Sequence, residues 1–437
     1  MSQYEIRSVS ARQVLSDRGN LAVEAFVTTA GGHTGRAVCT AGLSVGSHEI
    51  AFAYDEDRRW LGMGVQGAVE SVKTVIAPAL LGLDVRKQRD IDETMLRLKK
   101  ERPLGGNATA AVSAAALKAG ALAAEEPLYR YIGGGEAVTL PLASFGCYYG
   151  STRYDRLSRG GGKPTSSFIA YDFTSFSEGA EALGRVYRRW LDVLWQRYGL
   201  RPSGMPESYV FSGFVNIPAG IFASDEEIWD LAAGQIAACG YEGRIGLQLD
   251  VAADSYFHPD TGLYQGLFSP RPMTKPELMD YYREIVDRYP IVVLEDPLNE
   301  DDYEGTAILT DALGIQIVGD DLFTTNADRV RTGIAAGAAN TVLLKVNQVG
   351  TITQALDMVA LAYANGYGVM PCLSRGEREA IADYSVGINA ATIRECAFGA
   401  AGTRLRQIER ELGPRAVYPG KMGLKGRRFR PNGGDGQ

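Results

Sequence analysis

Three acidic residues that each end a short apolar run could together bind a metal ion. The residues before Asp250, Glu295 and Asp320 are mainly apolar, as is typical of buried strands. A carboxylate placed directly after such a strand needs water, a cation or a hydrogen-bond partner to offset its desolvation. Hard oxygen ligands that converge from three strand ends suit Mg²⁺, which keeps open positions for water and substrate oxygens.

A lysine ends a fourth apolar run, residues 341–345. A lysine at the mouth of a barrel can be desolvated and lie near a cation, and both effects lower its pKa toward the range of a general base. Lys345 is therefore the predicted base. Two alternatives stay open: each acid could cap the helix that follows its strand, and Lys345 could form a salt bridge with Asp320 or Glu295.

The elements that must position these residues alternate along the chain after Pro141. Apolar runs that predict strands are separated by stretches of helical periodicity, which indicates a βα barrel or a doubly wound sheet. Asp250, Glu295, Asp320 and Lys345 are separated by 45, 25 and 25 residues, which suits barrel units that each place their last residue at one rim. The predicted strands are 245–250, 291–295, 316–320, 341–345 and 367–370, and the predicted helices are 225–238, 275–288, 328–336 and 352–365.

The first part of the chain predicts a separate α+β domain. Residues 4–15 and 21–30 alternate apolar and polar positions on either side of a turn-like stretch, which indicates a hairpin. Helical periodicity follows over 65–98 and 108–124. The predicted organisation is an N-terminal capping domain (1–137), a barrel domain (138–425) and a disordered tail (426–437).

The glycine-rich stretch 158–163 does not fit the P-loop pattern and is interpreted as a mobile surface loop.

Composition narrows the class of protein. The net charge of −7 and pI of about 5.3 argue against a general nucleic-acid binder. No apolar run reaches the roughly 20 residues that span a bilayer. Five scattered cysteines without metal-site spacing favour a reduced environment, so we expect a cytoplasmic protein.

The segments around the four residues closely resemble those of the enolase family. The match extends over about residues 4–420. Its main segments are LDVAA (249–253), LEDP (294–297), QIVGDDL (316–322), LLKVNQVGT (343–351) and GLSVG (42–46). The resemblance implies an α/β fold with a modified (βα)8 TIM-type barrel under an N-terminal α+β cap, a homodimer and a Mg²⁺ cofactor. It also implies that Ser44, in a mobile loop, reaches a second Mg²⁺.

The chain departs from the family pattern at the residues that assist departure of the leaving group. Enolases remove the proton α to the carboxylate of 2-phosphoglycerate with the lysine, and a glutamate helps the 3-hydroxyl group to leave. Residues 211–218, where that glutamate is expected, contain no acid, and Ser167 replaces a partner glutamate. The family's histidine segment reads CLSRGE over 372–377, and none of His33, His48 and His258 can be assigned to a family histidine.

Arginine replaces the family's second lysine. Arg394 cannot act as a base, but its guanidinium can hold a carboxylate or phosphate bidentately. Arg375 and Ser374 are further candidates for substrate binding. The part of the site that stabilises an enolate is therefore predicted to persist.

These features predict a divergent Mg²⁺-dependent enzyme that forms an enediolate or enolpyruvate from a small phosphorylated or phosphonylated carboxylic acid. One enolase relative with altered leaving chemistry, carboxyphosphonoenolpyruvate synthase of phosphonate biosynthesis, is a candidate. The first alternative is an authentic enolase (phosphopyruvate hydratase) with a different general acid, for example Glu377 or Asp172. The second is an enolase-fold scaffold without turnover.

Overall fold

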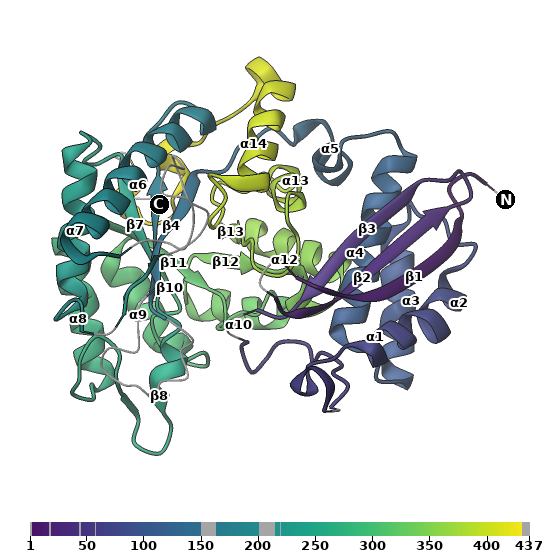
Figure 1. Cartoon of the computed structure of the whole chain (residues 1–437), viewed down its shortest axis with the longest axis horizontal. Coiled ribbons are helices and arrows are strands. Elements are labelled where there is room, and N and C mark those ends of the chain that lie inside the picture. The colour runs from purple at the N-terminus through teal and green to yellow at the C-terminus, as the bar shows by residue number, and fades with distance from the viewer. Residues whose placement is uncertain are drawn as a thin grey trace.

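The computed structural model of the chain describes residues 2–16, 19–42, 45–56, 58–149, 163–200, 215–218 and 220–430. Two parts lie beside each other in Figure 1, a smaller α+β part that holds the N-terminus and a larger barrel. Ser44, residues 211–214 and most of the glycine-rich stretch 158–163 lie outside the described residues.

The N-terminal part is an antiparallel three-stranded sheet covered by helices. Its strands are β1 (Ile6–Leu15), β2 (Leu21–Thr29) and β3 (Thr34–Thr40). The predicted hairpin is confirmed, because β1 pairs antiparallel with β2 up to Leu15 and Leu21. The alanine-rich α4 (Gly106–Ala123) packs on β2 and β3, and at Gly35 the backbones approach so closely that a Cβ would lie 2.0 Å from Ala115 O.

The helical structure predicted over 65–98 is divided among several helices. The structure has α1 (Gln66–Ser71), a π-helical turn (Val72–Ile76), α2 (Ala77–Leu80) and α3 (Gln88–Glu101). Leu81 leaves the helical region with ψ of 134° and Gly82 has φ of +81°, which ends the helix because glycine adopts this left-handed region without a steric penalty.

The larger part is built on an eight-stranded sheet. Its order is β13-β12-β11-β10-β7-β5-β4-β6. The strands are β4 (Ala143–Tyr149), β5 (Thr165–Ala170), β6 (Val215–Asn216), β7 (Ile245–Asp250), β10 (Ile291–Glu295), β11 (Gln316–Gly319), β12 (Thr341–Leu344) and β13 (Gly368–Pro371). β5 runs antiparallel to both β4 and β7, whereas β7, β10, β11, β12 and β13 are parallel.

The barrel closes through a segment that is not a regular strand. Arg394 forms a parallel bridge with Cys372, just after β13, and Thr392 forms one with Leu142, just before β4. The short β6 pairs only with the last two residues of β4, so residues 392–394 take the barrel position between β13 and the start of β4. In this circular order they lie opposite β10, and β5 lies opposite β12.

Helices surround the barrel as its parallel strands require. They are α6 (Phe176–Tyr198), α7 (Asp225–Ala238), α8 (Lys275–Arg288), α9 (Tyr303–Leu313), α10 (Ala327–Ala336), α12 (Ile352–Ala364), α13 (Ala380–Gly387) and α14 (Gly399–Leu412). Both faces of the central strands are consequently buried. Within the ranges described, no helix is long and apolar enough to cross a membrane.

Part of the predicted disordered tail is folded. Residues Arg427–Phe429 form a 3-10 turn, and the guanidinium of Arg427 donates to the carbonyl oxygen of Ala312 at 3.2 Å. Arg428 pairs with Asp287 at 2.6 Å. These contacts hold residues 427–428 in place, although the composition of this segment is typical of disordered chains. Residues 431–437 lie outside the described residues.

Candidate active site at the barrel mouth

The strand order brings the three predicted metal ligands to neighbouring strand ends. Asp250 is the last residue of β7, Glu295 is the last residue of β10, and Asp320 directly follows β11. Asp250 and Glu295 are register partners in the parallel pair of β7 and β10. All three side chains are buried although they are acidic, so each needs a compensating partner.

The helix-capping alternative is wrong for these acids. The N-cap side chains of the α-helices that follow β7, β10 and β11 belong to Thr274, Asp302 and Asn326. The carboxylates at the barrel mouth are therefore not used to begin helices.

Lys345 directly follows β12 and forms an ion pair with Asp320 through its Nζ. Burial alone would lower the pKa of Lys345, but the adjacent Asp320 carboxylate outweighs burial and raises the pKa. The predicted lowering relied on a cation next to Lys345, whereas the group next to Lys345 here is the Asp320 carboxylate. Burial raises the pKa of Asp320, but Lys345 reverses this effect and lowers it to about 2.

Arg394 reaches across the mouth from the segment that closes the barrel. Its guanidinium pairs with Glu295 through Nη1 and with Asp250 through Nη2. Nη2 also donates to Thr165 Oγ1 on β5 at 3.2 Å, and Nε donates to Glu395 at 3.0 Å. One guanidinium therefore connects three carboxylates.

The structure adds Lys163, which the sequence interpretation assigned to a mobile surface loop. Lys163 lies just before β5, and its Nζ forms an ion pair with Asp250. Burial, followed by the nearby Arg394 charge, lowers the pKa of Lys163 to about 8. The loop interpretation is wrong for this residue, because the described end of the stretch turns inward at β5, opposite Lys345.

Part of the donor set fits a divalent cation, because carboxylate oxygens of Glu295, Asp296 and Asp320 lie within 4.8 Å of one another, a group that does not include Asp250. Among the described residues at the mouth, three carboxylates face three cationic side chains, and yet the buried Glu295 Oε2 has no hydrogen-bond partner. Burial, followed by the Asp320 charge, raises the pKa of Glu295, which is the sign of an under-compensated carboxylate. Asp296 also lies close, but its oxygens already accept from the backbone N–H groups of Asp320 at 3.0 Å and Asp321 at 2.8 Å.

Arg375 and Ser374 differ in how free they are to bind substrate. Arg375 is 1% exposed and forms a bidentate pair with Glu49, which the N-terminal domain places over the barrel. Its charge is therefore already compensated. Ser374 Oγ is buried without a hydrogen-bond partner in the described part of the chain, so it is available to a ligand.

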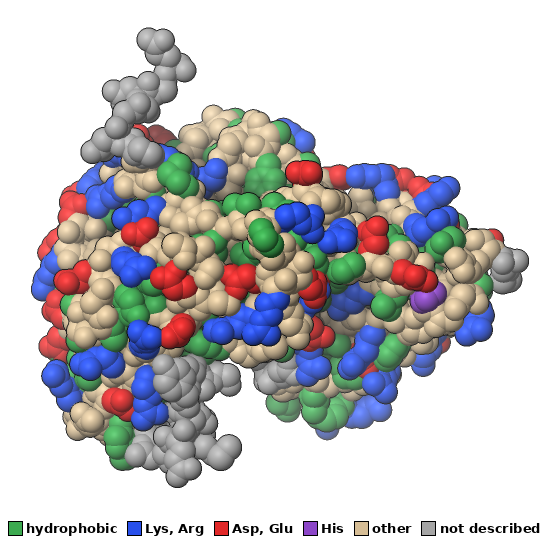
Figure 2. All heavy atoms as spheres, turned by 90° about the horizontal axis from the view of Figure 1, so that it is seen from above, with side chains coloured by type: hydrophobic (Ala, Val, Ile, Leu, Met, Phe, Trp, Pro, Cys, Tyr) green, Lys and Arg blue, Asp and Glu red, His purple; other side chains and the backbone are tan. Residues whose placement is uncertain are grey.

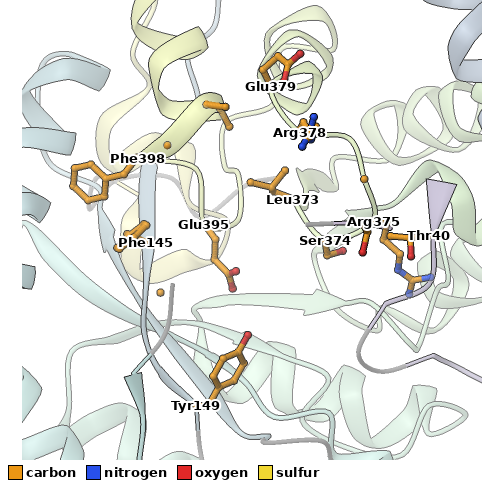
Figure 3. A pocket seen from close by; sticks show the side chains of 16 residues that line it. Thr40, Phe145, Tyr149, Leu373, Ser374, Arg375, Arg378, Glu379, Glu395 and Phe398 are labelled. Atoms are coloured by element: carbon orange, nitrogen blue, oxygen red, sulfur yellow. The ribbon is translucent and has the colours of Figure 1, made fainter. Parts of the chain in front are cut away.

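A cavity of about 520 Å³ is lined by Glu395, the residue that follows Arg394 in the chain. Phe145, Leu373 and Phe398 form an apolar wall, and Glu395, Tyr149 and Ser374 contribute polar groups (Figure 3). The metal ligands do not line this cavity, because Lys163, Lys345 and Arg394 fill the space next to their oxygens.

The structure separates the candidates for the missing general acid. Asp172 is 42% exposed, pairs with Lys421 and lies beyond the end of β5 that is remote from Thr165. Glu377 accepts from the backbone N–H of Arg375 at 2.8 Å and lines a neighbouring cavity instead. Ser167 is buried two residues deeper in β5 than Thr165, on the same strand face.

Glu395 and Lys163 are the residues that sequence reasoning missed. The available signal was their position, since each lies within two residues of a side chain at the mouth, Arg394 and Thr165 respectively. Neither lies at the end of a regular parallel strand, so strand periodicity gave no indication of them.

Comparisons with known proteins agree with this architecture. Residues 6–132 match the family model of the enolase N-terminal domain, and residues 170–426 match that of the enolase C-terminal TIM barrel domain. A protein named Enolase from Methanocaldococcus jannaschii is 39% identical over 94% of this chain and 96% of its own length. Another, from Pyrococcus furiosus, is 38% identical over 96% of this chain and 97% of its own length.

The agreement covers both parts of the molecule. The chain belongs to the enolase family and is an enzyme of the α/β class with an N-terminal domain and a C-terminal TIM barrel.

Proposed function

We propose that the chain is a Mg²⁺-dependent carbon–oxygen lyase that dehydrates 2-phosphoglycerate to phosphoenolpyruvate, with an altered general acid. The observation that carries this proposal is the set of buried acids at neighbouring strand ends beside Lys345, with Glu295 Oε2 left without a partner. The name Enolase, borne by relatives that match nearly the full chain, supports the same reaction.

The chain's own residues have distinct roles in this proposal. Lys345 takes the proton α to the substrate carboxylate, for which it must first give up its ion pair with Asp320. Arg394 and Ser374 bind anionic oxygens of the substrate. Mg²⁺ held by Asp250, Glu295 and Asp320 would supply positive charge that stabilises the enediolate. The buried surroundings strengthen each of these interactions by excluding water.

A second candidate is the formation of an enolpyruvate from a phosphonylated acid, as in carboxyphosphonoenolpyruvate synthase. The observation in its favour is Ser167, which is buried in β5 where the family's glutamate is expected and cannot protonate a leaving hydroxyl group. The names of the relatives favour dehydration over this candidate.

One assay separates these functions. The purified chain is incubated with 2-phosphoglycerate and Mg²⁺ in deuterated water, and α-deuterium incorporation and phosphoenolpyruvate are measured together. Dehydration supports the proposed function. Exchange without dehydration favours the second candidate. If neither occurs while Mg²⁺ still raises the unfolding temperature, the proposed function is wrong and a scaffold is favoured.

A further inference from the structure

We propose that Glu395 donates the proton to the leaving hydroxyl group, in place of the glutamate that the chain lacks. This inference rests on the proposed function and adds a catalytic residue to it. Neither Asp172 nor Glu377 is placed for the task, since one is remote and the other faces a different cavity. Glu395 is adjacent in the chain to Arg394, which contacts two of the metal ligands.

The backbone holds Glu395 in an uncommon conformation. Its φ of +64° lies in the left-handed region, which costs a non-glycine residue on the order of 1 kcal/mol or more. Ser144 Oγ accepts from the backbone N–H of Glu395 at 2.8 Å and donates to the carbonyl oxygen of Ile393. Strain of this kind persists only where the surroundings fix it, here by anchoring the residue to β4.

This conformation directs the side chain into the cavity. In Figure 3 the carboxyl group of Glu395 points between Phe145 on one side and Ser374 on the other, and it faces the hydroxyl end of Tyr149. The side chain is 14% exposed, so a substrate can reach it while bulk water is largely excluded. Glu379 also lines the cavity, but its carboxyl group points away from Glu395.

The guanidinium of Arg394 links Glu395 to the predicted metal ligands. It is shared among Asp250, Glu295 and Glu395, so no one carboxylate has it as a sole partner. The carboxyl group of Glu395 is therefore held next to the metal ligands while it faces the cavity.

The step balances in atoms and electrons. Lys345 takes the α proton, and the electron pair of that C–H bond becomes the second bond between C2 and C3. The C3–O bond breaks, its electron pair leaves with the hydroxyl oxygen, and the proton from the carboxyl group of Glu395 converts this oxygen to water. Solvent then returns a proton to Glu395 and removes one from Lys345.

A merely structural role for Glu395 is to hold the guanidinium of Arg394 in place. Glu395→Gln separates the two roles, because the amide oxygen still accepts from Arg394 Nε, whereas the amide cannot donate a carboxyl proton. α-Proton exchange requires Lys345 and Arg394 but no departure of hydroxide. The ratio of dehydration to exchange therefore reports on the acid alone.

The test compares the wild type, Glu395→Gln and the control Glu379→Gln with 2-phosphoglycerate and Mg²⁺ in deuterated water. We expect Glu395→Gln to lower phosphoenolpyruvate formation by about 10²–10³-fold, the usual size of a general-acid contribution, with exchange retained. Glu379→Gln should resemble the wild type in both rates. Added formate should restore dehydration in Glu395→Ala, because the cavity left by the side chain admits a small acid.

Three outcomes would overturn the inference. Dehydration at the wild-type rate in Glu395→Gln, with exchange intact, removes Glu395 from the reaction and leaves the proposed function standing. An equal fall in both rates assigns Glu395 to the positioning of Arg394. A wild-type chain that neither exchanges nor dehydrates 2-phosphoglycerate overturns the proposed function and this inference together.

Discussion

The two halves of the barrel mouth are built differently. In the first half, the parallel strands β7, β10, β11 and β12 end at Asp250, Glu295, Asp320 and Lys345. We call this the metal half. We call the other half the closing half. It consists of β13, residues 392–394, β4 and the antiparallel β5, and its side chains come from isolated β-bridges and from loops next to these strands.

The departures from the enolase pattern gather in the closing half. Ser167 lies on β5, Leu373 follows β13, and Arg394 belongs to the segment that closes the barrel. The metal half carries the residues that the resemblance assigns to metal binding and to the base. In the proposed function, the groups that make an enolate and the groups that handle the leaving group therefore lie largely on separate parts of the sheet, so one set can change while the other is retained.

The largest expected effect comes from the base of the metal half. Lys345→Ala should lower both exchange and dehydration by about 10³–10⁴-fold, because no other described residue occupies the end of β12. Rates are measured by deuterium incorporation with folding checked by circular dichroism. The exposed Lys275, which pairs with Asp302, provides the control Lys275→Ala. Retained exchange in Lys345→Ala would break the assignment of enolate formation to the metal half.

The next effect tests how the closing half is held by the N-terminal domain. Glu49→Gln removes the carboxylate that pairs with the buried Arg375, and loss of one partner of a buried pair costs about 3–5 kcal/mol. The free energy of unfolding is measured by denaturant titration. Arg331→Gln, at the exposed ion pair with Asp328, is the control and should cost under about 1 kcal/mol. A small loss in Glu49→Gln would instead indicate that Arg375 is available to substrate anions.

A smaller effect concerns cation binding by the metal half. Mg²⁺ at a hundred times its dissociation constant should stabilise the wild type by about 2.7 kcal/mol, as mass action requires. Glu295→Gln should lose most of this gain, because it removes the charge of the carboxylate whose Oε2 has no partner. Thermal unfolding with and without Mg²⁺ measures the difference, with Glu379→Gln as the control. An unchanged Mg²⁺ response in Glu295→Gln would contradict the ligand assignment.

The smallest effect is the dependence on pH of the free energy of unfolding, which tests the burial of Lys163 in the closing half. Burial lowers the pKa of Lys163 to about 8, below its unfolded-state value of 10.5. The unfolded chain therefore binds more protons than the folded chain between these values, so the Lys163 contribution to the free energy of unfolding rises with pH in this window. The slope is at most about 1.4 kcal/mol per pH unit. Lys163→Met should remove this rise in metal-free protein, and identical pH profiles for both proteins would show that Lys163 is not buried as described.

The metal half could be predicted from sequence because its geometry follows from periodicity. Each acid ends an apolar strand, and parallel strands of a barrel end at one rim. The closing half could not be predicted in this way. The direction of the Glu395 side chain depends on a left-handed backbone conformation, and the position of Lys163 depends on a turn into an antiparallel strand. Neither feature leaves a repeating pattern in the sequence. The raised pKa of Lys345 was also missed, because it depends on the partner present and not on burial alone.

Closure of the barrel by residues 392–394 has a consequence for biosynthesis. Arg394 emerges from the ribosome 144 residues after Asp250, which takes roughly 7 to 30 s at typical rates of about 5–20 residues per second. β13, which ends at Pro371, has no neighbour on one side until residues 392–394 follow it, and an unpaired strand edge can pair with other chains. The nascent chain thus lacks the guanidinium that contacts Asp250 and Glu295 until the segment that completes its active site has been made.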